Sequence, residues 1–333
     1  MYKEWKIPMN EIELIEKNIE IENTHTLEPW VNNLYIQAAT SQNTRKAYQS
    51  DIRHYETWGG ILPSTPQVIV RYLQHFASLL NTRTLSRRLT ALKQWHIYQG
   101  FMDPTQHPLV QKTLTGITRV HGKPRHKAYP LAPEDLLSIV SRLHTDDSLT
   151  CYRDNALLQI GFCGAFRRSE LVNIHVEHID WKEQGIDILI PQSKTDQQNE
   201  GQFCAIPFGK ALLCPVTALK KWLEKAAITK GPIFCEIKKN NKMMPKALSP
   251  LSVNHILKRR AIEAGLHYAN QLSSHSLRRG FATSASHFGV QLPIIMRQGR
   301  WKQVNTVIEY IEASARFTDN AVENIINHVY ESK

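Results

Sequence analysis

One stretch departs from the helical pattern of this chain and decides its fold class. Residues 185–207 read GIDILIPQSKTDQQNEGQFCAIP. The apolar segments 185–191 and 202–207 predict two short strands, and the polar segment 192–201 predicts the long turn that joins them. Because the sequence on both sides is mainly helical in pattern, we expect a mostly α protein with one small β-sheet.

The sequence before this hairpin has the caps and breaks of separate helices. Ser41 is a suitable N-cap, and Gly59, Gly60 and Gly100 follow expected helix ends. The predicted helices cover residues 44–58, 65–80, 84–98 and 107–119, and together they form a small all-helical domain. Further helices are expected from residue 132, over residues 154–162 and from residue 249 to the C-terminus.

The charge of the chain is distributed unevenly. Its formal net charge is +11, from 41 basic and 30 acidic residues. Residues 1–28 hold 3 bases and 7 acids, residues 29–130 hold 13 and 3, and the remainder holds 25 and 20. Such a basic middle segment is typical of proteins that bind a polyanion. Since no basic amphipathic helix with an aromatic face is visible, we favour nucleic acid over a membrane surface.

Length and composition exclude several classes of protein. The 333 residues suggest two domains, and a hydrophobic content of 42% excludes a disordered chain. No segment approaches eighteen consecutive apolar residues, and the N-terminus mixes acids and bases, so we expect a soluble cytoplasmic protein. The cysteines lack C-x-x-C spacing and are expected to be small buried hydrophobes: Cys151, Cys163, Cys204, Cys214 and Cys235.

The signatures of common cofactor and metal chemistries are missing from the sequence. It contains no P-loop, no G-x-G-x-x-G, no G-x-S-x-G and no acidic cluster in its basic region. His175 and His178 are three residues apart but have no partners at metal-ligand spacing, so we expect exposed histidines. The sequence therefore predicts a mechanism without a metal or a cofactor.

Two segments carry arginines suited to phosphate chemistry: GAFRRSEL at 164–171 and SHSLRRG at 274–280. A phosphodiester gains negative charge in its transition state, and a guanidinium can donate two parallel hydrogen bonds to it. Arg167 and Glu170 share one helix face, so the acid can hold the guanidinium in place. His275 and Arg278 are also three residues apart and share a face.

These segments resemble the first two boxes of the tyrosine recombinase (phage integrase) family. The third box is GRWKQVNTVIEY at 299–310, in which a tyrosine follows the tryptophan by nine residues, and it is most like that of the Cre-type members. The resemblance covers residues 130–333 strongly and 26–120 more loosely. It implies an N-terminal helical core-binding domain and an α-rich catalytic domain with a small β-sheet, the DNA breaking-rejoining fold.

The resemblance assigns roles to the first box and to the hairpin. Arg167 is the first-box arginine that binds the phosphate, and Glu170 is its supporting acidic neighbour. Arg168 is the alternative register, but its two-residue separation from Glu170 fits less well. Lys194 lies in the polar turn, where the family has a catalytic lysine, although a solvated turn lysine would have the same sequence context.

The resemblance also assigns roles to the second and third boxes. Tyr310 is the nucleophile, and nearby arginines would favour its phenolate, since tyrosine ordinarily has a pKa of about 10. Tyr330 is the other tyrosine near the C-terminus but lacks the box context. His275 and Arg278 fill the second box. Trp301 stands where many members have histidine, and simple core packing is the alternative reading of this residue.

The resemblance implies four regions and a set of partners. The regions are an acidic arm over 1–25, a core-type DNA-binding domain over 26–120, a basic linker over 121–130, and a catalytic domain over 131–333 with a docking helix at about 318–330. The partners are double-stranded DNA with paired inverted half-sites and, through exchange of the docking helix, the other copies of a homotetramer. The DNA-binding candidates are Arg45, Lys46, Arg83, Arg87, Arg88, Lys93, Lys123, Arg125, Lys127, Arg279 and Arg300.

The expected function is site-specific DNA recombination through a 3′-phosphotyrosyl intermediate and a Holliday junction. A phage, plasmid or transposon origin is favoured because of Trp301, and the protein would be associated with a bacterial or phage nucleoid. Arg300 is a departure from the family pattern, which commonly has a small residue there, and it is expected to reach DNA. A type IB topoisomerase and a catalytically silent homologue are the alternatives, but the second would have lost box residues, and none is lost.

Overall fold

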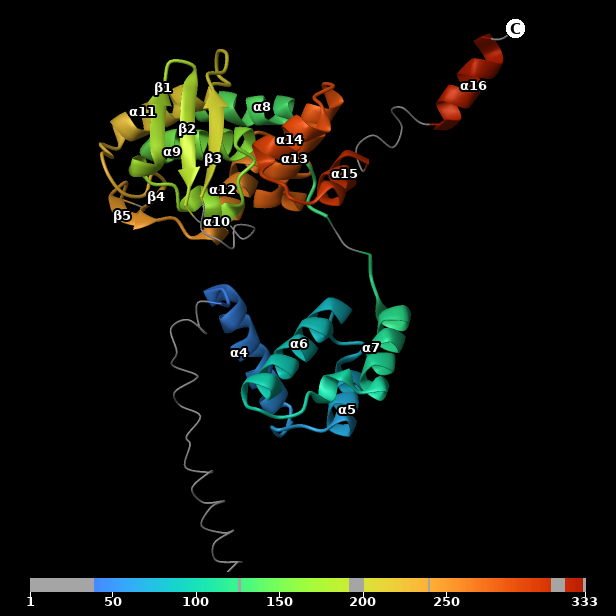
Figure 1. Ribbon diagram of the computed structural model, residues 1–333. Helices are drawn as coiled ribbons and strands as arrows, with labels where there is room; N and C mark the ends of the chain where they lie inside the picture. Colours follow the sequence, from blue (N-terminus) through green and yellow to red (C-terminus); the bar gives the residue numbers. More distant parts are fainter. Residues whose placement is uncertain (1–38, 125–126, 192–200, 239, 313–320, 332–333) are drawn as a thin grey trace, which may run out of the picture. The chain divides into compact units, whose positions relative to one another are not determined.

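The chain divides into two compact units, residues 1–125 and 126–333, in a computed structural model (Figure 1). The structure describes residues 39–124, 127–191, 201–238, 240–312 and 321–331. The predicted acidic arm at 1–25 lies outside these residues. The four-region division therefore stays a prediction, and each unit is described by itself below.

The N-terminal unit is all-helical in the part that the structure describes. Capping side chains begin its helices: Ser41 Oγ accepts from the Thr44 N–H at 3.3 Å, and Asn81 Oδ1 accepts from the Arg83 N–H at 2.9 Å. Gly100, at φ +75°, follows the third helix as predicted. The elements are α4 (Gln42–Thr57), α5 (Pro66–Phe76), α6 (Thr82–Tyr98), η1 (Pro104–Gln106) and α7 (Pro108–His121).

All four predicted helices of this unit are confirmed, but α5 ends four residues early. The Phe76 carbonyl accepts from the N–H groups of both Leu79 and Leu80, at 3.2 and 3.0 Å, and this tight turn closes the helix. The helices bury a core in which the Tyr72 ring packs edge-on against Tyr55 at 5.0 Å and Trp58 at 5.2 Å.

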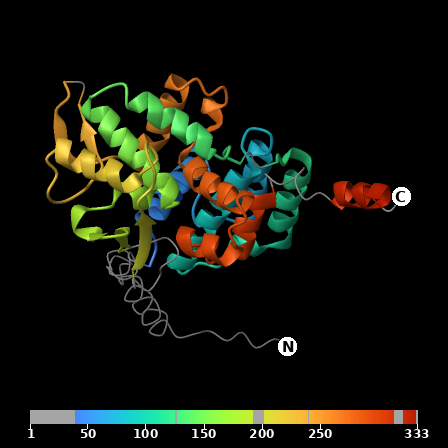
Figure 2. The same cartoon turned by 90° about the horizontal axis from the view of Figure 1, so that it is seen from above.

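The C-terminal unit combines helices with two small antiparallel sheets (Figures 1 and 2). Its strands are β1 (Ile179–Lys182), β2 (Gly185–Ile190), β3 (Gln202–Pro207), β4 (Cys235–Ile237) and β5 (Met243–Ala247). Its helices are α8 (Pro133–Leu143), α9 (Leu149–Cys163), α10 (Arg168–Val172), η2 (Val176–His178), α11 (Pro215–Lys225), α12 (Pro250–Glu263), η3 (Ala269–Gln271), α13 (Ser274–His287), α14 (Leu292–Gly299), α15 (Val304–Glu312) and α16 (Ala321–Glu331).

The predicted β2–β3 hairpin is confirmed, with Ile188 opposite Cys204, and the structure adds three strands that the sequence did not predict. β1 pairs with the other edge of β2, and β4 and β5 form a second sheet. Three of the four residues of β1 are exposed, so this strand has no apolar alternation to detect. Both views show α13–α15 at the opposite end of the unit from β4 and β5.

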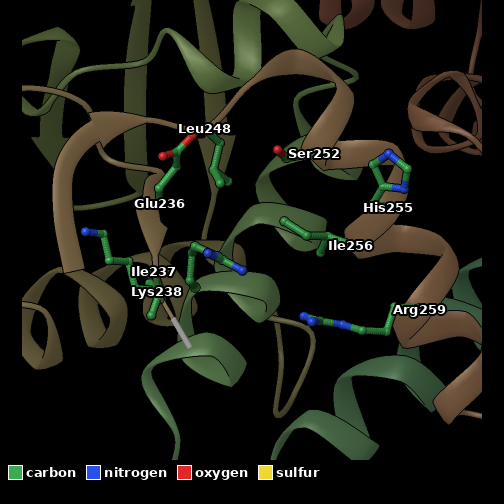
Figure 3. Close-up of a pocket in the computed structure, with 9 residues that line it drawn as sticks. Glu236, Ile237, Lys238, Leu248, Ser252, His255, Ile256 and Arg259 are labelled. Atoms are coloured by element: carbon green, nitrogen blue, oxygen red, sulfur yellow. The ribbon is translucent and has the colours of Figure 1, made fainter. Parts of the chain in front are cut away.

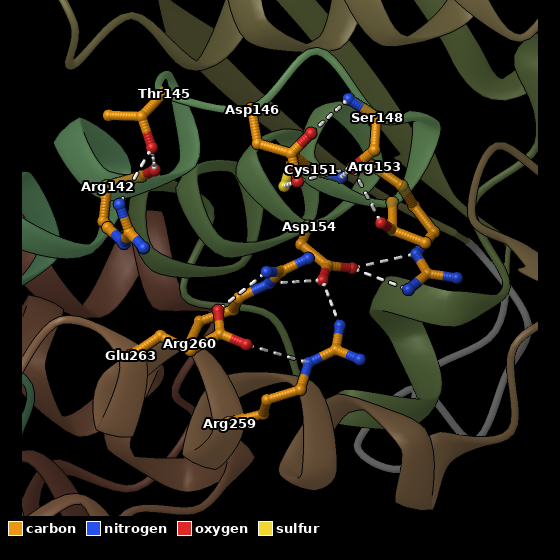
Figure 4. Close-up of polar contacts among 11 residues, drawn as sticks. Arg142, Thr145, Asp146, Ser148, Cys151, Arg153, Asp154, Arg259, Arg260 and Glu263 are labelled. Carbon is orange, nitrogen blue, oxygen red and sulfur yellow. Dashed lines mark hydrogen bonds and ion pairs between the residues drawn. The ribbon is translucent and has the colours of Figure 1, made fainter.

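The central helix α9 is buried on all sides, as predicted for residues 154–162. Asp154 on this helix lies at the centre of a group of charged side chains (Figure 4). We call this group the Asp154 cluster, and it consists of Asp154, Arg153, Arg259 and Arg260. Asp154 Oδ1 accepts from Arg153 at 2.7 and 2.9 Å, while Oδ2 accepts from Arg259 at 2.7 Å and from Arg260 at 2.8 Å. Arg259 and Arg260 belong to α12, so this single carboxylate joins α9 to α12.

Candidate active site

The first-box arginine stands at the N-terminus of α10 and is held there by Glu170 of the same helix. Arg167 is the N-cap of α10, and Glu170 Oε2 accepts from its main-chain N–H at 3.0 Å. Glu170 Oε1 accepts from Arg167 Nη1 at 2.6 Å. Burial alone would raise the pKa of Glu170, but the N–H and the charge of Arg167 hold this pKa below its usual range. The carboxylate therefore stays charged and fixes the guanidinium.

The local sequence explains why Arg167, rather than Arg168, faces inward. Ala165 has a φ of 44°, and a Cβ at Gly164 would lie 2.1 Å from the ring of Phe166. This tight turn directs Arg167 toward the candidate site and leaves Arg168 exposed. Arg167, and not Arg168, therefore lines the candidate cavity.

The second box places Arg278 in the interior of the unit. Arg278 is only 3% exposed, and its Nη1 donates to the Ala165 carbonyl. The guanidinium lies over the Trp301 ring at 4.0 Å. Its Nη2 is buried and has no hydrogen-bond partner. A buried charged donor without a partner is costly, so this arrangement is suited to an anion that arrives from outside.

The third box brings Trp301 and Tyr310 together. Trp301 is 8% exposed and packs in a small core with Ile295 and Val307, as the packing alternative for this residue expected. The rings of Trp301 and Tyr310 meet edge-on with centroids 6.2 Å apart. Tyr310 is partly buried, and the Arg279 guanidinium lies 5.8 Å from its ring centroid.

A cavity of about 170 Å³ joins these side chains. Five of the six predicted catalytic residues line it, namely Arg167, His275, Arg278, Trp301 and Tyr310. The sixth, Lys194, lies outside the residues that the structure describes. Sequence reasoning missed three further lining residues, Lys302, Gln303 and Thr306, although all three stand inside the third box.

The cavity is strongly positive. Burial and then the charge of Arg167 lower the pKa of Arg278 to about 9. Within the described residues, no group of three or more histidines, cysteines or acids could hold a metal ion. His175 and His178 were expected to be exposed, but both are partly buried, and their rings stack with centroids 5.1 Å apart. Arginines thus supply the positive charge of this site.

A larger cavity of about 370 Å³ lies between α12 and the β4–β5 hairpin (Figure 3). It is lined by Glu236, Lys238, His255 and Arg259, among others, and by none of the predicted catalytic residues. Arg153 also lines it, but that guanidinium already donates to Asp154 and to the Cys235 carbonyl. This cavity offers no unpartnered buried donor, so the smaller one is the better candidate for chemistry.

The predicted DNA-binding residues differ in their exposure. Lys46, Arg83, Arg87, Lys123 and Lys127 are exposed, whereas Arg45, Arg88 and Lys93 are partly buried; Arg125 lies outside the described residues. In the N-terminal unit, the buried Asp51 accepts two hydrogen bonds from Arg87, both at 2.8 Å. Lys127 pairs with Glu309 at 2.9 Å.

The structure corrects the prediction for Arg279 and Arg300. Arg279 is 8% exposed and donates to the Ala128 carbonyl, and Arg300 is 7% exposed. Neither side chain lies on the surface: their Nη atoms donate to main-chain carbonyls of the catalytic unit, and the Nε of each is buried without a partner. The expectation that Arg300 reaches DNA is therefore wrong for this structure.

The cysteines and helices agree with the compositional expectations. All five cysteines are free thiols, and four of them are buried. Burial raises the pKa of Cys163 to about 12, so this thiol is unreactive. None of the helices in the described part of the chain is long and apolar enough to cross a membrane.

Two family descriptions match this chain. Residues 130–316 match the phage integrase family, and residues 27–99 match the phage integrase N-terminal SAM-like domain. The chain belongs to the phage integrase family. Its members are tyrosine recombinases, and the chain accordingly is a site-specific DNA recombinase by enzyme class.

Individual relatives agree with this family assignment. The chain is 37% identical to the integrase/recombinase xerD homolog of Selenomonas ruminantium, over 94% of each protein. It is 26% identical to recombinase cre of Escherichia phage P1, over 82% of this chain and 84% of that one. This integrase, whose third box is of the Cre type, is thus similar over most of its length both to the xerD homolog and to recombinase cre.

A solved structure supports the fold of this integrase. The XerH recombinase bound to palindromic difH substrate in a post-cleavage complex superposes with a TM-score of 0.60. The match covers 85% of this chain and 78% of that one at 17% identity. The predicted mostly α tyrosine recombinase fold is thus confirmed.

Proposed function

We propose that this integrase cuts and rejoins DNA through a 3′-phosphotyrosyl intermediate formed by Tyr310. The observation that carries the proposal is the buried, unpartnered Nη2 of Arg278 in a cavity that Tyr310 also lines. A scissile phosphate would complete the missing hydrogen bond and neutralise the positive cavity. XerH, the structural relative described above, is seen with its DNA substrate after cleavage.

The proposed reaction needs no external energy. The Tyr310 oxygen attacks phosphorus, and the bond from phosphorus to the 5′ oxygen breaks. His275 accepts the tyrosine proton, or holds it in position as it leaves. Lys194 protonates the leaving 5′ oxygen, which becomes a free hydroxyl. The 5′-hydroxyl of a partner strand then attacks the phosphorus and releases Tyr310. Exchange of the first pair of strands in this way produces a Holliday junction. Because the covalent bond conserves the phosphodiester, neither ATP nor a nuclease metal is required.

Two arginines and Trp301 bind the scissile phosphate in this proposal. Arg167 and Arg278 bind the phosphate oxygens and stabilise the charge that develops in the transition state. Trp301 fixes Arg278 by stacking at 4.0 Å and would donate its indole hydrogen bond to the phosphate. Removing either arginine should lower the cleavage rate about a hundredfold or more.

The proposed partner is double-stranded DNA with paired inverted half-sites. The exposed bases of the N-terminal unit, among them Lys46 and Arg83, would contact phosphates, so binding should weaken steeply with salt. On the same reading the basic linker at 121–130 tracks the DNA backbone. A phage, plasmid or transposon origin and a nucleoid location follow from this reading of the third box.

The proposed assembly is a homotetramer on DNA. Helix α16 begins at Ala321, three residues after the predicted start of the docking helix. Val322, Ile325, Ile326 and Val329 on this helix are 50–64% exposed. Such an apolar stripe favours burial against another surface. We therefore assign α16 to exchange between neighbouring protomers.

The test uses duplexes that tile the DNA flanking this protein's own gene, each nicked close to a candidate scissile phosphate. Wild type should form a covalent protein–DNA adduct without metal or ATP, and Tyr310→Phe should form none. Tyr330→Phe is the matched control, since Tyr330 is an exposed tyrosine of α16, and its adduct should persist. An adduct in Tyr310→Phe would refute the nucleophile. Salt-sensitive specific binding without any adduct would favour the silent homologue, and relaxation of supercoils without strand exchange would favour the topoisomerase.

A further inference from the structure

Arg300 combines two unfavourable features at one position. It ends α14 with a φ of 56°, a left-handed conformation that disfavours residues other than glycine. Its guanidinium is also buried, with 7% of the residue exposed. A buried charge on a strained backbone persists only where the surrounding contacts hold it, and such positions cluster at functional sites.

The contacts of Arg300 converge on the first box. Its Nη2 donates to the Gly164 carbonyl at 3.0 Å and lies 3.5 Å from Glu170 Oε2. Its guanidinium lies 4.7 Å from the ring centroid of Phe166. Its Nη1 donates to the Gln298 carbonyl at 2.8 Å on its own helix. One side chain thus joins the end of α14 to the loop that leads into α10.

The charges of this cluster show what Arg300 can do. Glu170 binds Arg167 through Oε1 and faces Arg300 through Oε2, so one carboxylate lies between two guanidiniums. Arg300 also contributes to the low pKa of Glu170, after the larger effects of Arg167. With Arg278 included, three guanidiniums and one carboxylate leave a surplus of two positive charges, which matches a pentavalent phosphate with about two negative charges.

We propose that Arg300 is a positioning residue of the recombinase, which holds Glu170 and the 164–167 loop so that Arg167 meets the scissile phosphate. This inference rests on the proposed function. We place Arg300 away from the phosphate because it does not line the cavity that Tyr310 and Arg278 share. Its Nη1 and Nη2 point to protein oxygens, and its buried Nε has no hydrogen-bond partner. It links the third box, which carries Tyr310, to the first box, which carries Arg167.

The experiment measures single-turnover adduct formation on the nicked duplex that wild type cleaves. Arg300→Gly relieves the left-handed strain but removes the guanidinium, and Arg300→Lys keeps the charge but not the forked contacts. Both should cleave about 10- to 100-fold more slowly than wild type, with unchanged DNA affinity, because a loss of positioning acts on the chemical step. Ala227→Gly is the matched control: Ala227 is an exposed residue with a φ of 51° at the end of α11, and its variant should cleave normally.

A double-mutant cycle separates positioning from a merely structural role. If Arg300 acts through Glu170, then Arg300→Gly combined with Glu170→Gln should cleave no more slowly than Glu170→Gln alone. Millimolar guanidinium chloride should also accelerate Arg300→Gly relative to sodium chloride at equal ionic strength. Additive losses in the cycle, or wild-type cleavage by both Arg300 variants, would overturn the inference. An inactive wild type would instead refute the proposed function, so the two failures are distinguishable.

Discussion

The unpartnered guanidinium of Arg278 predicts that its removal will leave the free protein intact while abolishing its chemistry. The fall in the pKa of Arg278 from 12.5 to about 9 corresponds to roughly 4–5 kcal/mol of free energy against the charged guanidinium. Arg278→Met would release this energy. It would lose about 2 kcal/mol from the hydrogen bond to the Ala165 carbonyl and about 1 kcal/mol from the contact with Trp301.

The matched control is Arg153→Met. Arg153 is 5% exposed and Arg278 is 3% exposed, but Arg153 donates twice to Asp154. Arg153→Met removes two charge-assisted hydrogen bonds from Asp154, which keeps Arg259 and Arg260, and should destabilise the protein by about 3 kcal/mol. Arg278→Met should instead be about 1 kcal/mol more stable than wild type. For a unit of this size the two variants should therefore differ by roughly 8–16 °C in Tm.

The assay is thermal unfolding of the full chain, followed by cleavage of the nicked duplex. Arg278→Met should cleave at least about a hundredfold more slowly than wild type. Sulfate should raise the Tm of wild type more than that of Arg278→Met, since an anion that binds the folded state stabilises it. Equal destabilisation by the two substitutions would refute the reasoning, because Arg278 would then be paired within the protein.

Three further predictions concern other parts of the molecule. Glu170→Gln should lower the Tm most at pH 6–7, because the pKa of folded Glu170 is lowered and its charged form stabilises the protein. The difference from wild type should begin to shrink as the pH falls below the ordinary glutamate pKa of about 4.3, and it should vanish only below the lowered pKa of folded Glu170; a constant difference across thermal scans would contradict this. Gly299→Ala places a Cβ 1.7 Å from Trp301 Cζ3 and should destabilise by about 1–3 kcal/mol and slow cleavage, whereas Gly116→Ala, where a Cβ meets nothing within 4 Å, should be neutral or slightly stabilising in the same scans. Asp51→Asn should lower the calorimetric transition of the N-terminal unit by an amount equivalent to about 3 kcal/mol, because it leaves Arg87 and Arg88 without their buried carboxylate; an unchanged transition would show that the pair contributes nothing.

Local signals explain why much of the fold could be predicted. The caps at Ser41 and Gly100 act on neighbouring residues, so the sequence contains all that is needed to place the ends of α4 and α6. The three-residue spacing of Arg167 and Glu170 is local in the same way. Only the family resemblance predicted that these segments meet Tyr310 in one site. No local signal joins residues that are more than a hundred positions apart.

Long-range contacts explain what could not be predicted. Asp154 looks like an ordinary helix residue in the sequence, and its partners Arg259 and Arg260 lie on α12, more than a hundred residues away. Arg300 was expected to reach DNA, but its side chain is buried and donates to the Gly164 carbonyl, which is equally remote in the sequence. β1 was missed because its pairing with β2, rather than its own composition, stabilises it.

The Asp154 cluster also limits how this protein can evolve. A substitution of Asp154 alone would leave three guanidiniums close together, two of them buried, so variants that lose the carboxylate first should be removed by selection. An accessible route begins at Arg259, which is half exposed and whose loss leaves two arginines on the carboxylate. Descendants of this chain should therefore vary at Arg259 before they vary at Asp154, and should retain the aspartate wherever Arg153 and Arg260 are both present.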